Sequence, residues 1–201
     1  SQDLGLPSFA LLNARSLVQR IDELSAILNT NKTDIAAISE TWFPSYADPS
    51  YFSISGYSRF SRPRSHKRGW GVAFYIRDTI QVNTLQHVKV PEQLEVLWVW
   101  ARPLRLPRSV SGLILAVLSH PPASLFEDLL IDHLVSTLDI LQTKYPSSGI
   151  IILGDFNKMD TDVLGRLTGL DQIVNTPTRG PAILDKILTN LKNHYHAPQV
   201  T

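Results

Sequence analysis

The sequence IIILGDFN occupies positions 150 to 157. Four aliphatic residues in a row are typical of a strand buried on both faces, and this run ends in Gly154-Asp155-Phe156-Asn157. Glycine, aspartate and asparagine are common turn residues, so a plain turn after the strand is one interpretation. The other interpretation is that Asp155 and Asn157 are polar side chains held on a rigid support at the end of a buried strand.

Two earlier segments end in the same way. Phe9–Leu12 predicts a short buried strand followed by Asn13, and Asp34–Glu40 predicts a second strand that ends in a carboxylate. A single such residue is more often an ordinary surface residue, but the ordered set predicts that these side chains converge at one rim of a sheet sandwich. Carboxylate and amide oxygens suit Mg²⁺, and a second carboxylate can orient or deprotonate an attacking water.

The remaining apolar segments predict more strands than helices. Further strands are predicted at Tyr57–Phe60, Gly71–Arg77, Leu94–Ala101, Leu113–Leu118 and Ile183–Thr189, and Pro44–Gly56 is predicted to be a loop. Because Trp98 and Trp100 share one face of their strand with Leu94 and Val96, we expect them in the core rather than stacked on a ligand.

Two long helices are predicted between the strands. The first follows a capping box formed by Ser16 and Gln19, and its inward stripe consists of Leu17, Ile21, Leu24 and Leu28. The second follows a capping box formed by Ser124 and Glu127 and runs to about Lys144. Its predicted inward residues are Leu125, Leu129, Leu130, Leu134, Leu138 and Leu141, with His133 in or at the core. A short helix is predicted around Asp162–Leu167. Long helices placed between strands favour an α/β (α+β) fold with two packed sheets and helices outside.

The composition is that of a well-buried globule. Of the 201 residues, 43% are hydrophobic and 18% are charged, which argues against disorder. The absence of cysteine excludes a disulfide framework and a thiolate metal site. No apolar run approaches the roughly 20 residues that span a bilayer, and residues 1–8 do not resemble a signal peptide.

The net charge of +1 hides an uneven distribution. Between Arg59 and Arg108 there are ten Lys and Arg residues against three Asp and Glu residues, whereas the rest of the chain has nine against fifteen. The cluster of Arg59, Arg62, Arg64, Lys67 and Arg68, with Tyr57, Phe60 and Trp70 among them, is either a surface for a DNA backbone or a solvated loop. For Arg102, Arg105 and Arg108 we expect a solvent-exposed loop on the far side of the molecule.

Six motifs follow one another in an order that resembles the endonuclease/exonuclease/phosphatase superfamily. They are Asn13-Ala14-Arg15-Ser16-Leu17, Glu40-Thr41-Trp42, Gly71-Val72-Ala73, His120-Pro121-Pro122, Gly154-Asp155-Phe156-Asn157 and Leu184-Asp185-Lys186-Ile187-Leu188-Thr189-Asn190. Within that superfamily, the first, second and last motifs resemble the endonucleases of non-LTR (LINE, CR1/L2/Jockey-like) retrotransposons. The resemblance covers nearly the whole chain.

The resemblance implies a fold and an activity. The implied fold is a DNase I-like, four-layer sandwich of two mixed β-sheets with helices on the outer faces, forming a single domain over residues 1–201. The implied activity is a Mg²⁺-dependent endonuclease, with Mn²⁺ as a possible substitute, that nicks one strand of double-stranded DNA. The 3′-hydroxyl it leaves would prime reverse transcription in the nucleus, after synthesis of the protein in the cytoplasm. A reverse transcriptase domain would follow in the same polyprotein.

The resemblance also implies roles for individual residues. Glu40 would bind the metal with Asn13 beside it, Asp155 would orient or activate water, and Asn157 would hold the scissile phosphate. Asp185 matches the carboxylate that normally supports the catalytic histidine of the superfamily. Thr178 and Arg179 fall where the family places loop residues that contact DNA. With Arg15 and the basic cluster, the residues predicted to contact nucleic acid are Arg15, Arg62, Arg64, Lys67, Arg68, Thr178 and Arg179.

The sequence departs from the superfamily pattern at three places. Ser119 stands where a tyrosine usually precedes the His-Pro-Pro turn, and Trp70 stands where a glycine is usual. The third departure is the final Ser-Asp-His segment, and we expect the strand that carries it to lie beyond Thr201. A catalytically inactive member that binds nucleic acid or a protein is therefore an alternative. A phosphatase for phosphorylated small molecules is a further alternative, disfavoured by the retrotransposon-like first and last motifs.

Overall fold

The strands of the protein form two sheets that pack face to face. The computed structural model describes residues 5–44, 47–62, 71–122 and 125–201. In this part of the chain, a four-stranded sheet has the order β1-β2-β4-β3 and a six-stranded sheet has the order β5-β6-β7-β8-β10-β9. The first sheet contains β1 (Phe9–Asn13), β2 (Ile35–Ser39), β3 (Tyr57–Arg62) and β4 (Val72–Arg77). The second contains β5 (Gln81–Thr84), β6 (Glu95–Arg102), β7 (Leu113–Ser119), β8 (Gly149–Asp155), β9 (Asp171–Gln172) and β10 (Asp185–Thr189).

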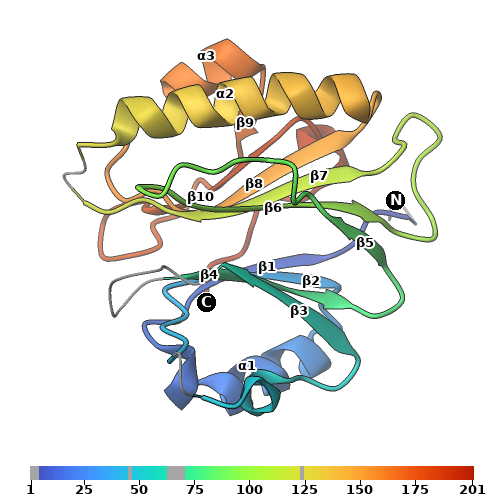
Figure 1. Cartoon of the computed structure of the whole chain (residues 1–201), viewed down its shortest axis with the longest axis vertical. Coiled ribbons are helices and arrows are strands. Elements are labelled where there is room, and N and C mark those ends of the chain that lie inside the picture. Colours follow the sequence, from blue (N-terminus) through green and yellow to red (C-terminus); the bar gives the residue numbers. More distant parts are fainter. Residues whose placement is uncertain (1–4, 45–46, 63–70, 123–124) are drawn as a thin grey trace.

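Helices cover the outer face of each sheet, so the molecule has four layers (Figure 1). The helix α1 (Ile21–Thr30) lies on the four-stranded sheet, and α2 (Glu127–Lys144) and α3 (Asp162–Thr168) lie on the six-stranded sheet. Short 3₁₀ helices span Leu17–Gln19, Pro49–Phe52 and Lys192–His194. None of the helices in the described part of the chain is long and apolar enough to cross a lipid bilayer.

The sequence pattern predicted most of these elements because the buried strands are continuous apolar runs. Every residue of β2, β7 and β8 is buried, as expected for strands covered on both faces. Three apolar clusters fill the spaces between the layers: one between the sheets, one under α2 and α3, and one under α1. The predicted four-layer α/β fold is therefore confirmed.

Both predicted capping boxes are wrong or lie outside the described residues. Ser16 precedes a 3₁₀ helix, has a φ of 88° and makes no side-chain capping bond, and α1 begins only at Ile21. The residue before α2 is Phe126, also without a capping bond from its side chain, and Ser124 lies outside the described residues.

Local patterns also misplaced three other features. Leu125, predicted to point inward, is 94% exposed, because the regular helix starts two residues later and does not carry it onto the sheet. The strand β5 was not predicted, since its four residues are mostly polar and it pairs only as an edge strand with β6. The segment predicted as a loop before Gly56 contains the 3₁₀ helix at Pro49–Phe52.

Strand pairing brings the polar strand ends to one rim. Asn13 lies opposite Ser39 in the parallel pair of β1 and β2, so Glu40 follows beside it. In the other sheet, Asp155 lies between Ser119 and Asp185 in the ladders with β7 and β10. The rim of each sheet therefore carries carboxylates at the same end of the molecule.

Gly154 is required by the approach of two strands rather than by a turn. The residue lies within β8, and a Cβ atom there would come within 2.0 Å of the carbonyl oxygen of Leu118. A side chain at this position would push β7 away from β8. The plain-turn interpretation of the Gly-Asp-Phe-Asn segment is therefore wrong for Gly154 and Asp155, which are both in the strand.

A buried polar pair joins β6 to α2 inside the apolar layer. The indole Nε1 of Trp98 donates to Nε2 of His133 over 3.0 Å, and Nδ1 of His133 lies 3.3 Å from the hydroxyl of Thr137. Because an indole nitrogen can only donate, Nε2 must accept and Nδ1 carries the proton. Burial, followed by the charge of Arg62, lowers the pKa of His133 to about 4. The predictions that His133 and Trp98 are core residues are confirmed.

This pair predicts a loss of stability in acid. The pKa of His133 falls from an ordinary 6.5 to about 4 on folding, so the unfolded chain binds the proton more readily between these values. The stabilisation is complete above pH 6.5 and is lost as the pH falls through about 4. The expected contribution is about 3 kcal/mol of unfolding free energy. The variant His133→Gln keeps an acceptor for Trp98 but has no imidazole to protonate. In urea unfolding, the unfolding free energy of this variant should depend less steeply on pH than that of the wild type.

The exposed His87 provides the matched control. His87→Gln should leave the pH dependence of the unfolding free energy as in the wild type. Equal pH dependence in His133→Gln and the wild type would contradict the assignment of this acid sensitivity to His133.

Candidate functional site

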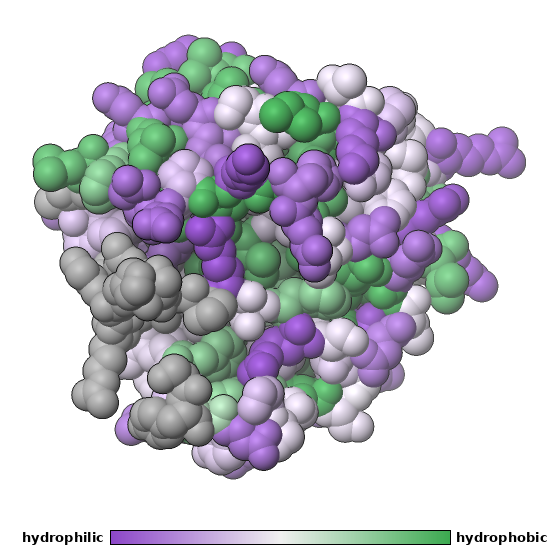
Figure 2. All heavy atoms as spheres, viewed as in Figure 1, coloured by the Kyte–Doolittle hydropathy of each residue, from purple (hydrophilic) through white to green (hydrophobic). Residues whose placement is uncertain are grey.

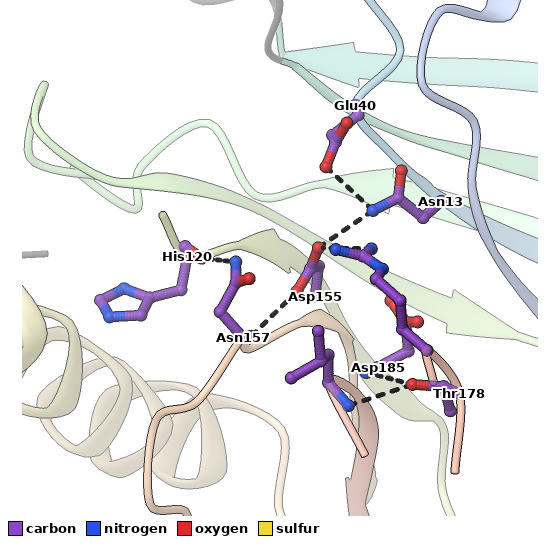
Figure 3. Close-up of polar contacts among 9 residues, drawn as sticks. Asn13, Glu40, His120, Asp155, Asn157, Thr178 and Asp185 are labelled. Atoms are coloured by element: carbon purple, nitrogen blue, oxygen red, sulfur yellow. Dashed lines mark hydrogen bonds and ion pairs between the residues drawn. The ribbon is translucent and has the colours of Figure 1, made fainter. Parts of the chain in front are cut away.

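One amide joins two carboxylates across the two sheets. Nδ2 of Asn13, the last residue of β1, donates to Oε1 of Glu40 over 2.9 Å and to Oδ2 of Asp155 over 3.0 Å (Figure 3). Glu40 follows β2 in the four-stranded sheet, whereas Asp155 ends β8 in the other sheet. The predicted convergence of Asn13, Glu40 and Asp155 at one rim is therefore a feature of the structure.

Asp155 is almost completely buried and is surrounded by donors. Its side chain is 1% exposed. Besides the bond from Asn13, Oδ1 accepts from the backbone N–H of Asn157 over 2.8 Å, and Oδ2 accepts from Nη2 of Arg179 over 3.2 Å. These donors, one of them cationic, offset the free energy needed to remove a carboxylate from water.

Asn157 is held next to Asp155 by a second set of contacts. Its φ of 49° turns the chain back after β8, and its side-chain Nδ2 donates to the carbonyl oxygen of His120 (Figure 3). The backbone N–H of His120 in turn donates to the carbonyl oxygen of Asp155 over 2.8 Å. Burial lowers the pKa of His120, although Glu127 and Asp155 oppose this, so the imidazole is neutral near pH 7.

The backbone around the site is strained. Residues other than glycine rarely adopt a positive φ. Here Arg15 has a φ of 44°, Glu40 of 54° and Trp42 of 50°. Backbone bonds from Ser16 to the carbonyl oxygen of Glu40 and from Thr41 to that of Gly71 hold this segment in place. Strained residues that persist at a cluster of carboxylates indicate a functional constraint on geometry.

Asp185 completes a cluster of three carboxylates. It pairs with Asp155 in the ladder of β8 and β10, and its backbone N–H donates to the Thr178 hydroxyl over 3.1 Å. Burial, then the negative charge of Asp155, raises the pKa of Asp185, and the charge of Glu40 adds to the effect. Thr178 and Arg179 oppose this shift without cancelling it.

The oxygen atoms at the rim are of the kind that bind a magnesium ion. No group of three or more His, Asp or Glu side chains is arranged to hold a metal among the described residues. Mg²⁺ in proteins needs only one or two carboxylates, however, and keeps several waters. Oδ1 of Asn13 is buried and accepts no hydrogen bond from the described residues, which leaves an oxygen ligand beside the carboxylate of Glu40. Glu40 and Asn13 are therefore the residues that would hold the ion.

Sequence comparison identifies the family. The family model of the endonuclease/exonuclease/phosphatase family matches residues 9–195. The chain belongs to this family. Its members hydrolyse phosphate esters, either as nucleases or as phosphatases. A search of curated protein sequences finds no match.

Solved structures of the endonuclease/exonuclease/phosphatase family share the fold. The endonuclease domain of TRAS1, a telomere-specific non-LTR retrotransposon, has a TM-score of 0.61 at 18% identity, over 91% of this chain and 84% of that one. The AP endonuclease LMAP from Leishmania major has a TM-score of 0.67 at 17% identity, over 90% of this chain and 78% of that one. D. rerio TDP2 complexed with single strand DNA product has a TM-score of 0.60 at 13% identity, over 91% of this chain and 83% of that one. At these identities the likeness concerns the fold.

The residues predicted to contact nucleic acid occupy different environments. Arg15 is exposed next to the strained backbone of the rim, and Arg179 reaches Asp155 directly. Thr178 accepts backbone bonds from Leu184 and Asp185, so its hydroxyl shapes the loop before β10. Arg64, Lys67 and Arg68 lie outside the described residues.

Arg62 differs from the free basic residue that we expected. Its guanidinium is half-buried and donates to the carbonyl oxygens of Val90 and Val96 over 3.3 and 3.4 Å. Burial lowers its pKa. Arg62 thus links β3 to the six-stranded sheet, and the structure gives no support to the prediction that it contacts a DNA phosphate.

Two residues at the site were not singled out as site residues from the sequence. Trp42 is 39% exposed two residues after Glu40, and His120 supplies the backbone contacts that orient Asn157. Both belong to motifs that were recognised, Glu40-Thr41-Trp42 and His120-Pro121-Pro122. A motif shows which residues occur together, but it does not show which of their atoms face the site.

The raised pKa of Asp185 predicts that its charge destabilises the fold. A carboxylate whose pKa rises on folding favours the folded state only at low pH, and this benefit is lost as the pH rises through the folded pKa. Asp185→Asn removes the charge with little change in shape. In EDTA at pH 7.5 the variant should melt at a higher temperature than the wild type, and the difference should shrink towards pH 4.

The exposed Asp132 on α2 provides a control for loss of one negative charge. Asp132→Asn should leave the melting temperature nearly unchanged at both pH values. A lower melting temperature for Asp185→Asn at pH 7.5 would show instead that the carboxylate contributes more through hydrogen bonding than it costs through charge.

Proposed function

We propose that this protein is a Mg²⁺-dependent DNA endonuclease that nicks one strand of a duplex and leaves a 3′-hydroxyl. The observation that carries the proposal is the single amide of Asn13 between the carboxylates of Glu40 and Asp155. This contact supports the proposal because the carboxylate that we assign to the metal and the carboxylate that we assign to water activation accept from the same amide. Metal-assisted hydrolysis of a phosphodiester uses one group of each kind.

Each residue of the rim has its own role in the proposed reaction. Asp155 orients the attacking water and takes its proton as the new bond to phosphorus forms. The bond from phosphorus to the 3′-oxygen breaks, and that oxygen takes a proton from solvent. A metal held by Glu40 and Asn13 would polarise the phosphoryl oxygen and stabilise the leaving group.

Asn157 and Arg179 are positioned to hold the scissile phosphate. The amide of Asn157 uses one N–H on His120, which leaves the second N–H for a phosphate oxygen. Arg179 is about one-third exposed, so its guanidinium can contact a phosphate from solvent while it remains near Asp155. Arginine is suited to this task because its fork of donors matches phosphate geometry.

Retrotransposition is the proposed biological setting. The motifs resembling non-LTR retrotransposon endonucleases and the similarity in fold to the TRAS1 endonuclease domain both support it. In that setting the 3′-hydroxyl primes reverse transcription in the nucleus, and a reverse transcriptase domain follows in the same polyprotein. The exposed Arg15 beside the rim and the partly exposed Arg179 support DNA as the substrate, since Lys and Arg neutralise backbone phosphates.

Plasmid nicking tests the proposed reaction. Supercoiled plasmid should be converted to the open circle in Mg²⁺ and not in EDTA. Because Asp155 is assigned to the proton transfer, Asp155→Ala should lower the nicking rate by about 10²- to 10⁴-fold. Glu40→Gln should lower it by a comparable factor and raise the Mg²⁺ concentration needed. The exposed Glu92 gives the matched control Glu92→Gln, which should nick as the wild type does.

A nucleic-acid-binding protein without nuclease activity is the second candidate, and Ser119 favours it. Ser119 ends β7 directly beside Asp155 and is 5% exposed, so this position offers no side chain that can reach a phosphate. If the wild type and a Ser119→Tyr variant both bind plasmid in Mg²⁺ and neither nicks it, this candidate replaces the first. Nicking that is gained only in Ser119→Tyr would show that the catalytic arrangement is otherwise intact.

Arg179 has its own test, because it carries the phosphate in this proposal. Arg179→Ala should lower the nicking rate on the order of 10²-fold, as expected for loss of one donor to a developing charge. Arg179→Lys keeps the charge but loses the fork of donors, so it should recover only part of the rate. Turnover and KM measured separately on duplex DNA distinguish the roles, since a purely structural contact with Asp155 would leave KM unchanged. Arg166→Ala, on the exposed side of α3, is the control.

A further inference from the structure

A pocket lies at the opposite end of the molecule from the carboxylate rim. It has a volume of about 570 Å³, and its walls come from the end of β6, the following loop and the end of α2. The rim lies at the end of β8, whereas this pocket lies beside the start of that strand. The loop that lines it is the light-green loop at the right of Figure 1, and the same margin in Figure 2 carries both hydrophilic and hydrophobic residues. We call it the rear pocket.

Two aromatic rings form one wall of the rear pocket. Trp100 and Tyr145 stack with ring centroids 5.1 Å apart at an interplanar angle of 20°. Gly112 lets the indole lie against the backbone, because a Cβ atom there would come within 2.5 Å of the ring. The indole Nε1 of Trp100 is buried and has no hydrogen-bond partner among the described residues. The sequence predicted Trp100 as a core residue, but it is only partly buried and faces this pocket.

The rest of the lining is basic. Arg102, Arg108 and Lys144 line the pocket, and all three are exposed. None of them forms an ion pair with a described carboxylate, and no Asp or Glu lines the pocket. The Lys144 ammonium lies 5.6 Å from the centre of the Tyr145 ring. Three cations close together without a carboxylate repel one another, and an anion would relieve this repulsion.

We infer that the rear pocket binds a nucleotide of a single-stranded nucleic acid. Non-specific binding of single strands combines basic side chains along the backbone with aromatic side chains that contact bases. The rear pocket supplies both: Trp100 and Tyr145 face the base, and Arg102, Arg108 and Lys144 face the phosphates. A base paired in a duplex is stacked between its neighbours and cannot enter such a recess.

This inference does not depend on the proposed nuclease activity. The rear pocket shares no residue with the rim that contains Asn13, Glu40 and Asp155. An acidic peptide would also be attracted by the three cations. It would leave the aromatic wall of Trp100 and Tyr145 without a matching group, so the structure favours the nucleic acid.

Fluorescence anisotropy with labelled oligothymidylate and oligouridylate tests the inference on the intact chain, in EDTA to prevent cleavage. Arg108→Gln combined with Lys144→Gln should weaken binding at least tenfold. It should also reduce the slope of log affinity against log salt by about 1.4, since each phosphate contact to a single strand contributes about 0.7. Tyr145→Leu should weaken binding without changing this slope.

Two control proteins separate the rear pocket from general charge and from the rim. Arg166→Gln combined with Lys89→Gln removes two exposed positive charges that do not line the pocket, and this variant should bind as the wild type does. Asp155→Ala should also bind the oligonucleotides normally. The rear-pocket variants should nick plasmid within about twofold of the wild-type rate if the wild type nicks.

Any one of three results would overturn the inference. The first is an unchanged oligonucleotide affinity in the Arg108 and Lys144 variant, and the second is an equal loss of affinity in the Arg166 and Lys89 control. The third is binding of oligoglutamate without binding of either oligonucleotide. Failure of the wild type to nick plasmid would count against the nuclease proposal alone, because the anisotropy measurement does not involve cleavage.

Discussion

Burial of the Asp155 carboxylate constrains much of the architecture. A charged group that is 1% exposed needs compensating donors, and they come from separate parts of the chain. Asn13 reaches Asp155 from the other sheet, Arg179 from the loop before β10, and Asn157 from the turn that follows β8. The two sheets must therefore pack with the end of β1 next to the end of β8, because otherwise the buried charge of Asp155 would lose a hydrogen-bond donor. The arrangement of the rim follows from this requirement.

Several local features that reduce stability are explained by the same requirement. Glu40 and Asn157 have positive φ values, and Asp185 has a raised pKa beside two other carboxylates. Each is unfavourable in isolation, and the surrounding packing and backbone bonds keep them in place. Such a concentration of negative charge is what a divalent cation would neutralise. Stability is thus reduced at the place where we propose that the protein carries out its chemistry.

The two ends of the molecule have opposite electrostatic character. The rim gathers Glu40, Asp155 and Asp185, whereas the rear pocket gathers Arg102, Arg108 and Lys144 around an aromatic wall. Strand direction produces this separation, because the rim follows the end of β8 and the rear pocket lies beside its start. The two proposals assign different chemistry to these two places: metal-assisted hydrolysis to the rim, and contact with bases and phosphates to the rear pocket.

The sequence by itself determined the layers and the main site residues. Apolar runs and their periodicity are local properties, so the buried strands, the stripes on α1 and α2, and the polar ends at Asn13, Glu40 and Asp155 could be predicted. It missed β5, whose polar residues become a strand only by pairing with β6, and it assigned capping boxes that the helices do not use. Only the tertiary structure decided that Arg179 contacts Asp155, that Arg62 is held between the sheets and that Trp100 faces a pocket. The contacts of Arg179 and Arg62 join residues that are 24 or more positions apart in the sequence. They depend on how loops and sheets pack, and a local sequence pattern contains no information on that packing.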